Sequence, residues 1–395
     1  MNINKLRIIN PLICYFFAWF ISISVFEMQF SFLLEGIHED FLFFLVINFI
    51  LIVLGFFLAK LKFISPERKK LKIKDDYIKL SSLTYKAIIL LACVEFVQIV
   101  YSDGVPIVWA LTGNGKTYFD FGIKSVNGLV NSLYLVIELN ISILYAAKFN
   151  SKKNRNLFLL LLLLPIVILS RQLIVSSCME FIVIYLSYNR ISLKACIRGI
   201  VLTIVSIFGF GYLGDIRTGA EVFRSLAQVR YDWLENLPSG ILWVGIYIST
   251  PIANLQNTLE YVQPDDVYIH TFERLMPSIF QRENEVALLS NMTHDTGLIA
   301  SNFTVSSYMH PPLLDQGEWF VYLVTFAVGI IGGLIYYTAL KKRIYIYIAF
   351  NCIFSMMCLL SIFDNMFFYL PVVFQFAIVY IFHRIGVYRI NVKYE

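Results

Sequence analysis

One long polar segment, residues 214–317, contains arginine but no lysine, which suggests a site for anions. A guanidinium group is planar and donates two parallel hydrogen bonds to a phosphate, whereas a lysine ammonium is a flexible point charge. Arginine without lysine is therefore typical of a site for phosphate or pyrophosphate. A further arginine, in a short turn between two apolar segments, needs an anion or a polar interior beside it. The candidate pyrophosphate-binding residues are Arg171, Arg217, Arg224, Arg230, Arg274 and Arg282.

The same segment holds three candidates for a general base, the group that takes a proton from an attacking hydroxyl. These are His294, His310 and Asp315. No His, Asp or Glu spacing here matches a metal motif such as HExxH, so we predict neither a metal ion nor a cofactor. Two alternatives stay open. A single histidine is more often a structural hydrogen-bond partner, and arginines on an interfacial helix often contact phospholipid phosphates.

The rest of the chain is predicted to be membrane scaffold. Of its 395 residues, 58% are hydrophobic and 15% are charged, which excludes a soluble globular protein of this length. Apolar runs long enough to cross about 30 Å of hydrocarbon recur along the sequence. We therefore expect an all-α, polytopic membrane protein with ten spans, at 8–26, 41–61, 83–101, 127–149, 157–170, 172–189, 197–213, 319–340, 345–362 and 366–383.

The distribution of charge predicts the topology of these spans. Most lysines and arginines collect in alternate loops, which the positive-inside rule assigns to the cytoplasm, together with both termini. The apolar stretch 241–255 is short and contains Pro251, and a crossing there would turn the basic residues after the eighth span outward. We interpret it as a re-entrant segment. The expected parts are a seven-span bundle (1–213), a large outer loop (214–317) and a three-span bundle (318–395).

Within the outer loop, residues 215–236 have the spacing of an amphipathic helix lying on the membrane surface. On such a helix Arg217 and Arg224 share one face, and Arg230 lies beside it. Inside the predicted spans, three carboxylates either mark a functional site or fix packing through partners such as Gln98, Asn140 or Arg171. These carboxylates are Glu95, Glu138 and Glu180.

The pair Glu39-Asp40 at the start of the second span has two interpretations. It is similar to the acidic pair that polytopic glycosyltransferases carry in their first outer loop. It also suits the positive end of a helix dipole.

Five short motifs occur across the chain: Ser170-Arg171, Gly-Asp-Ile-Arg at 214–217, the stretch 247–255, Asn-Phe-Thr at 302–304 and Asp-Gln-Gly at 315–317. With these motifs the chain resembles the O-antigen polymerases, the Wzy-type family that polymerises oligosaccharide repeat units at the bacterial inner membrane. The similarity in layout extends over nearly the whole chain. The resemblance implies a donor in which the repeat unit is linked through pyrophosphate to undecaprenol, and a growing glycan that leaves its lipid pyrophosphate for the next repeat unit.

The resemblance also implies a location and partners. We expect a multi-pass protein of the bacterial inner membrane with a periplasmic site, membrane lipids around it, and contacts with a chain-length regulator and a flippase, but no nucleic acid. Competing functions are an O-antigen ligase, a lipid-linked oligosaccharide flippase, and a glycosyltransferase that uses a polyprenyl-monophosphate sugar. The absence of an internal repeat argues against the flippase.

Overall fold

The protein is almost entirely α-helical where its structure is described. The computed structural model describes residues 7–62, 77–113, 115–189, 197, 225–235, 237–277, 297–300 and 303–387. Across these ranges the only β-type pairing is one isolated bridge between Ser31 and Val229. The all-α prediction is confirmed.

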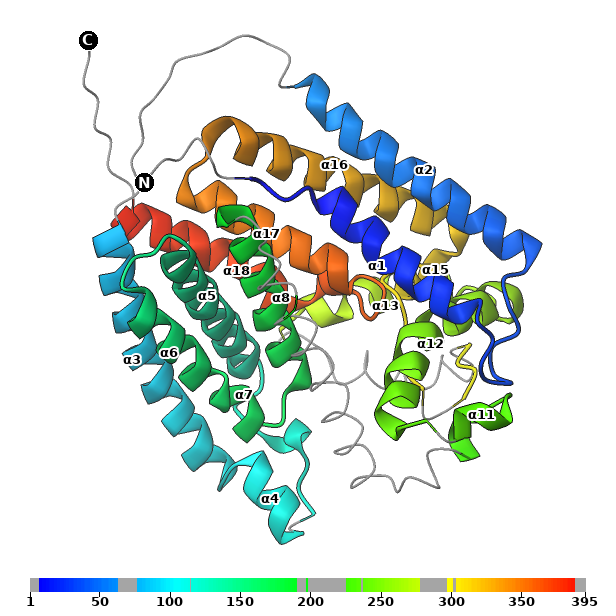
Figure 1. Ribbon diagram of the computed structural model, residues 1–395, viewed down its shortest axis with the longest axis horizontal. Helices are drawn as coiled ribbons and strands as arrows, with labels where there is room; N and C mark the ends of the chain where they lie inside the picture. The colour runs from blue at the N-terminus through cyan, green and yellow to red at the C-terminus, as the bar shows by residue number, and fades with distance from the viewer. Residues whose placement is uncertain are drawn as a thin grey trace.

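The helices follow one another along the chain as Figure 1 shows. The N-terminal part contains α1 (Pro11–Phe26), α2 (Glu39–Leu61), α3 (Tyr77–Ser102), α4 (Pro106–Thr112), α5 (Val126–Ala146), α6 (Ser151–Leu161), α7 (Leu163–Val167) and α8 (Arg171–Tyr188). The predicted outer loop contains α11 (Asp232–Glu235), α12 (Ser239–Tyr261), α13 (Ile269–Phe272) and α15 (His310–Gln316). The C-terminal part contains α16 (Glu318–Lys342), α17 (Tyr345–Leu360) and α18 (Leu370–Phe382).

Four helical segments are long and apolar enough to cross a membrane. They are Glu39–Leu61, Tyr77–Thr112, Val126–Ala146 and Glu318–Lys342, with mean hydropathies between 1.6 and 3.0. Three further apolar helices, α1, α17 and α18, are shorter. The chain therefore has the composition and helix lengths of a helical membrane protein. The predicted span at 197–213 lies almost wholly outside the described residues.

One predicted span, 157–170, contains a short interruption between two helices. Helix α6 ends at Leu161, and α7 begins only at Leu163. Pro165 explains the break, because a proline has no N–H and its ring collides with the carbonyl four residues earlier, here that of Leu161.

The helices form two packed groups. In the first, α2 lies along α16, and glycines allow their backbones to approach closely. A Cβ atom added at Gly329 would lie 2.4 Å from the carbonyl oxygen of Ile52, and one at Gly333 would lie 2.4 Å from that of Phe56.

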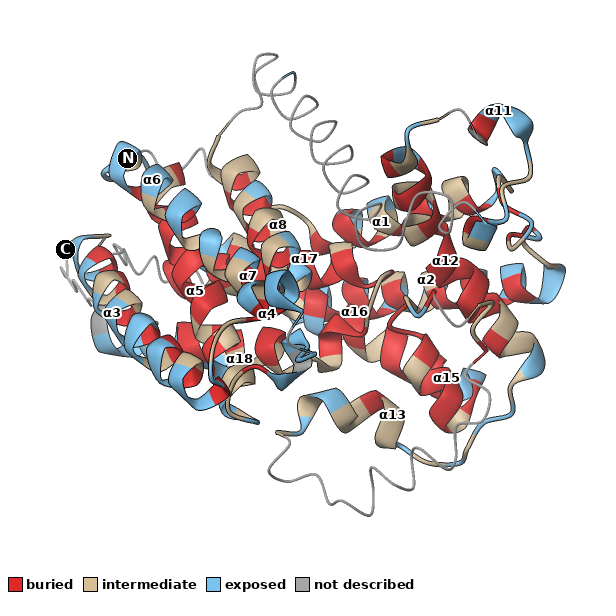
Figure 2. Ribbon diagram, turned by 90° about the horizontal axis from the view of Figure 1, so that it is seen from below, coloured by how far each residue is buried: buried red, intermediate tan, exposed pale blue. Residues whose placement is uncertain are grey.

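In the second group, α5 is enclosed by α3, α6, α8 and α18. Figure 2 shows α5 mostly buried and α3 largely exposed at the margin. The exposed side chains of α3 include Ile89, Phe96 and Val100, so this face suits contact with lipid tails.

The segment 241–255 is a continuous helix and not a broken one, and its re-entrant position stays a prediction. It belongs to α12, a 23-residue helix that continues through Pro251 and that does not qualify by composition as a membrane-spanning helix. Hydroxyl groups beside the proline bond backbone carbonyls: Ser249 donates to Gly245, Thr250 to Ile246, and Ser22 of α1 to Ile248. Such contacts make an internal proline tolerable because they satisfy backbone groups around the distortion.

The expected amphipathic helix at 215–236 is helical at 225–227 and at Asp232–Glu235 but is interrupted between them. Gln228 has a positive φ of 45°, and α11 begins only at Asp232. The reason is tertiary pairing: Phe32 donates its N–H to Gln228 (2.8 Å), and Arg230 donates its N–H to Phe30 (2.9 Å). These backbone groups bond the loop between α1 and α2, so they cannot continue a helical ladder. Residues 215–224 lie outside the described residues.

Candidate functional site

The turn that joins α17 to α18, residues 361–369, brings two of the candidate arginines into one neighbourhood. Arg274 forms an ion pair with Asp364, and its guanidinium lies 4.5 Å from the centre of the Tyr369 ring. Gln172, the residue after Arg171, donates from Nε2 to the sulfur of Met366 at 3.5 Å. Arg274 thus contacts this nine-residue turn directly, and Arg171 is next in sequence to a residue that contacts it.

Aromatic contacts fix the outer segments against this turn. The ring of Phe272 packs edge-on against Phe368 with centroids 5.0 Å apart, and Tyr308 packs against Phe367 at 5.2 Å. The backbone N–H of Tyr308 also donates to the carbonyl of Ser361 at 2.8 Å. Edge-to-face aromatic pairs have a preferred geometry, so these contacts orient the segments as well as bury them.

Arg171 is the first residue of α8 and is exposed to solvent. The turn before it is tight, with Leu169 at a positive φ of 56° and the N–H of Ser170 bonded to Pro165 at 2.8 Å. The N-terminus of a helix carries partial positive charge, so an arginine there is favourable only when an anion lies nearby. Backbone N–H groups at the N-terminus of a helix also favour an anion.

Asp315, a predicted general base, is fully buried and is bonded to backbone groups. Its two carboxylate oxygens accept the N–H groups of His270 (3.0 Å) and Thr271 (2.9 Å), at the start of α13. Burial raises the pKa of Asp315, and these hydrogen bonds partly oppose that rise. The carboxylate therefore acts as a cap that holds residues 270–271 in place.

His270 was missed by sequence reasoning, yet it has the arrangement of a general base. Its Nε2 lies 2.8 Å from Asp265 Oδ2, and its side chain is 9% exposed. A carboxylate bonded to one ring nitrogen fixes the tautomer and leaves the other nitrogen to accept a proton. The nearby sequence gives a signal that could have found it, since Asp265 lies five residues before it and Arg274 four residues after it.

The other predicted site residues lie elsewhere or are not described. His310 is buried and begins α15. Arg230 donates from its guanidinium to Gln29 Oε1 at 2.9 Å and lies 5.3 Å from the Phe32 ring centre, so it fastens the loop between α1 and α2. Four candidates lie outside the described residues: Arg217, Arg224, Arg282 and His294.

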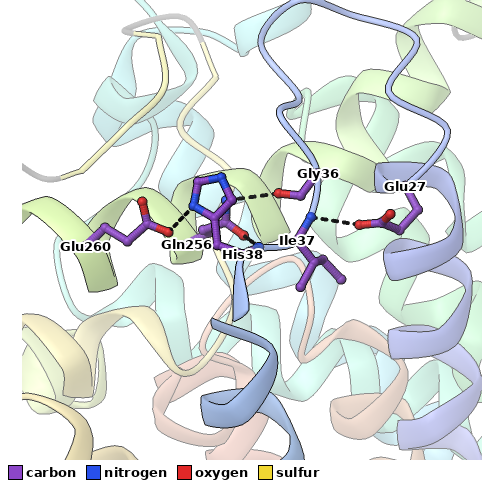
Figure 3. Close-up of polar contacts among 6 residues, drawn as sticks. All are labelled: Glu27, Gly36, Ile37, His38, Gln256 and Glu260. Atoms are coloured by element: carbon purple, nitrogen blue, oxygen red, sulfur yellow. Dashed lines mark hydrogen bonds and ion pairs between the residues drawn. The ribbon is translucent and has the colours of Figure 1, made fainter. Parts of the chain in front are cut away.

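A second histidine–carboxylate pair fixes the loop before α2 on the end of α12 (Figure 3). His38 Nδ1 lies 2.5 Å from Glu260 Oε1, and the N–H of His38 donates to Gln256 at 3.2 Å. Gln256 in turn donates to the carbonyl of Gly36 at 3.0 Å. The neighbouring Glu39 and Asp40 are exposed in the first turn of α2, the position that the helix-dipole interpretation predicts.

The carboxylates inside the helices differ in their partners. Glu95 accepts a hydrogen bond from Gln98 at 3.2 Å, the kind of partner that the packing interpretation expects. Glu138 of α5 and Glu180 of α8 are completely buried.

No group of three or more His, Cys, Asp or Glu side chains within the described ranges is arranged to hold a metal ion. Comparison of the chain with protein-family models, curated proteins and solved structures finds no match.

Proposed function

We propose that the chain is a glycosyltransferase of the O-antigen polymerase type, acting at the periplasmic face of the bacterial inner membrane. In this proposal ten spans carry an outer loop at 214–317, and an undecaprenyl-pyrophosphate-linked oligosaccharide is the donor. The observation that carries the proposal is the ion pair of Arg274 with Asp364 in the turn 361–369, near the His270–Asp265 pair. Gln172, the residue after Arg171, contacts the same turn. Glycosyl transfer from a pyrophosphate needs positive charge to stabilise the leaving group and a base to take the proton of the attacking hydroxyl. Guanidinium groups and a histidine supply these two functions.

The reaction assigns a role to each group. A hydroxyl of the incoming repeat unit attacks the anomeric carbon of the donor, and the bond from that carbon to the pyrophosphate oxygen breaks. Negative charge develops on the departing pyrophosphate, where Arg171 and Arg274 stabilise it. The Nδ1 atom of His270 takes the hydroxyl proton, and Asp265, bonded to Nε2, stabilises the imidazolium that forms.

Asp315 then serves as a positioning residue for His270. His310, His294 and the arginines at 217, 224, 230 and 282 remain candidates for the wider site, with Arg230 the least suited because it already bonds Gln29.

The test is the surface glycan of a strain that lacks the gene, together with polymerisation by the purified protein. We expect lipopolysaccharide cores that carry a single repeat unit in the strain, and polymer from lipid-pyrophosphate repeat units in vitro. Bare cores with accumulated lipid-linked polymer would instead indicate a ligase. Bare cores without any outward-facing intermediate would indicate a flippase.

A further inference from the structure

Tyr308 joins the outer segment 303–309 to the turn 361–369. Its backbone N–H donates to the carbonyl of Ser361 at 2.8 Å, and its ring packs edge-on against Phe367 with centroids 5.2 Å apart. The side chain is completely buried. Backbone and side chain of this one residue therefore both hold the turn in place.

The hydroxyl of Tyr308 is held by two apolar helices. Its Oη lies 3.2 Å from the hydroxyl of Tyr15 in α1 and 2.9 Å from that of Thr325 in α16. From α1, Trp19 also donates its indole N–H to Ser361 Oγ at 3.3 Å. Because these buried groups bond one another, they specify one arrangement of the two helices, the outer segment and the turn.

The two groups that the proposed reaction uses, His270 and Arg274, are held by different elements. Asp315 of α15 accepts the backbone N–H of His270 at 3.0 Å, whereas Asp364 of the turn pairs with the Arg274 guanidinium. The placement of the base relative to the guanidinium therefore depends on how α15 lies against the turn.

A short, hydrogen-bonded link connects Tyr308 to α15. The helix begins at His310, whose N–H donates to the carbonyl of Ser307 at 3.1 Å. The N–H of Met309 donates to Ser307 Oγ at 3.3 Å. These bonds make residues 307–310 one compact turn, so a shift of Tyr308 would move the start of α15 relative to the turn 361–369.

We propose that Tyr308 is a positioning residue for the site. It holds α15 against the turn 361–369 and so places His270 and Arg274 for the same substrate. Its own hydroxyl takes no part in the chemistry, because it is buried and bonded on two sides. The inference rests on the proposed glycosyl transfer. Since misplacement of reacting groups by about 1 Å can cost on the order of 10²-fold in rate, the effect belongs in kcat.

The test compares Tyr308→Leu with Tyr308→Phe in the polymerisation assay, well below the Tm of both variants. Leucine removes the ring contact with Phe367, whereas phenylalanine keeps the ring and loses only the hydroxyl. We expect Tyr308→Leu to lower kcat about 10- to 100-fold with KM within about twofold of the wild type, and Tyr308→Phe to restore kcat to within about threefold.

The control is Tyr345→Leu at the other end of α17. Tyr345 is 1% exposed and donates to Asn140 at 2.6 Å, so it is buried and bonded much as Tyr308 is. It begins α17 and lies about 24 Å along the helix from the turn, at about 1.5 Å per residue. Its loss should lower Tm and leave kcat near the wild-type value. Equal losses of kcat in the two leucine variants would overturn the proposal.

Phe367→Leu removes the same ring contact from the side of the turn, and it serves if Tyr308→Leu does not fold. We expect a similar loss of kcat. Wild-type kcat in Phe367→Leu would overturn the proposal.

Hydrogen–deuterium exchange separates this inference from the proposed function, because it needs no turnover. The N–H groups of His270 and Thr271, which bond Asp315, should exchange faster in Tyr308→Leu than in Tyr345→Leu, by about tenfold. That pattern in a wild-type protein without polymerase activity would refute the glycosyl transfer but keep the placement of this segment by Tyr308. Equal exchange at residues 270 and 271 in both variants would refute the placement, whatever the activity.

Discussion

Arg274 and Asp364 form an ion pair that joins the outer segment after α12 to the turn between α17 and α18. The pair uses one end of the guanidinium, and the Tyr369 ring covers its face at 4.5 Å. A guanidinium has five N–H donors, so several remain for an anion, and the Arg274 side chain is 40% exposed. The ion pair therefore orients Arg274 without removing it from the site.

The first prediction concerns the type of cation at the site. If Arg171 and Arg274 grip pyrophosphate through two parallel bonds, Arg→Lys at either should impair polymerisation nearly as much as Arg→Ala. We expect a rate loss on the order of 10²–10³, by analogy with removal of one oxyanion donor. Initial rates of polymer formation measure it. Arg155→Lys, at an exposed arginine of α6 that is not a site candidate, is the control and should keep most activity. Full-length glycan from the Arg171→Lys and Arg274→Lys variants would contradict the assignment.

The second prediction separates charge stabilisation by arginine from metal catalysis. Polymerisation by the purified protein should continue in excess EDTA, because arginines supply the charge that a divalent ion provides in other glycosyltransferases. Glu39→Ala should keep substantial activity, since that exposed side chain complements the dipole of α2. Loss of polymer in EDTA and its recovery with Mg²⁺ or Mn²⁺ would favour a metal site at Glu39-Asp40 instead.

The third prediction is that α12 does not cross the membrane. Single cysteines at Ser239 and Tyr261, the two ends of the helix, should both react with an impermeant thiol reagent from the outer side in a cysteine-free protein. The physical reason is composition: the helix is not apolar enough to qualify as a span. If position 261 reacted only after permeabilisation, the ten-span topology would be wrong.

The fourth prediction concerns the contact between α2 and α16. Gly329→Ala and Gly333→Ala each place a Cβ 2.4 Å from a carbonyl of α2, so the helices must separate. We expect each to lower the free energy of unfolding by about 1–3 kcal/mol, as overpacking does. Gly128→Ala is the matched control, because its Cβ would lie 3.5 Å from Leu370 and alanine favours a helix. Thermal unfolding in detergent compares them, and equal stability of all three variants would refute the close approach.

The fifth prediction follows from the raised pKa of Asp315. A carboxyl whose pKa is higher in the folded protein than in the unfolded chain stabilises the folded state fully at pH values below the unfolded-chain pKa. This stabilisation is lost as pH rises through the folded-state pKa. The Tm of the wild type relative to Asp315→Asn should therefore fall as pH increases above 3.8, the ordinary aspartate value. The variant should also show a pH-independent loss of about 1–3 kcal/mol, because its amide nitrogen cannot accept a backbone N–H. A constant difference in Tm across pH would contradict the assigned shift.

Apolar runs and helix-ending signals determined much of the scaffold. The run at 41–61 predicted α2, and the run at 319–340 predicted α16, because about twenty apolar residues have few alternatives to a buried helix. The acidic first turn of α2 was also predictable, since the helix dipole is a local property.

Other features depended on contacts between distant segments. Residues 225–235 have helical spacing, but Gln228 and Arg230 pair with the loop before α2. Asp315 was predicted as a base from its residue type alone, and only folding brought the N–H groups of residues 270 and 271 to its carboxylate.

The sequence by itself determined that the chain is a helical membrane protein with arginines gathered in one polar segment, because hydropathy and composition act residue by residue. The tertiary structure decided which side chains the arginines meet. Arg274 pairs with Asp364 in the turn 361–369, which Gln172, the neighbour of Arg171, also contacts, whereas Arg230 bonds Gln29. These pairings join residues far apart along the chain, and the packing of whole helices, which no local pattern encodes, brings them together.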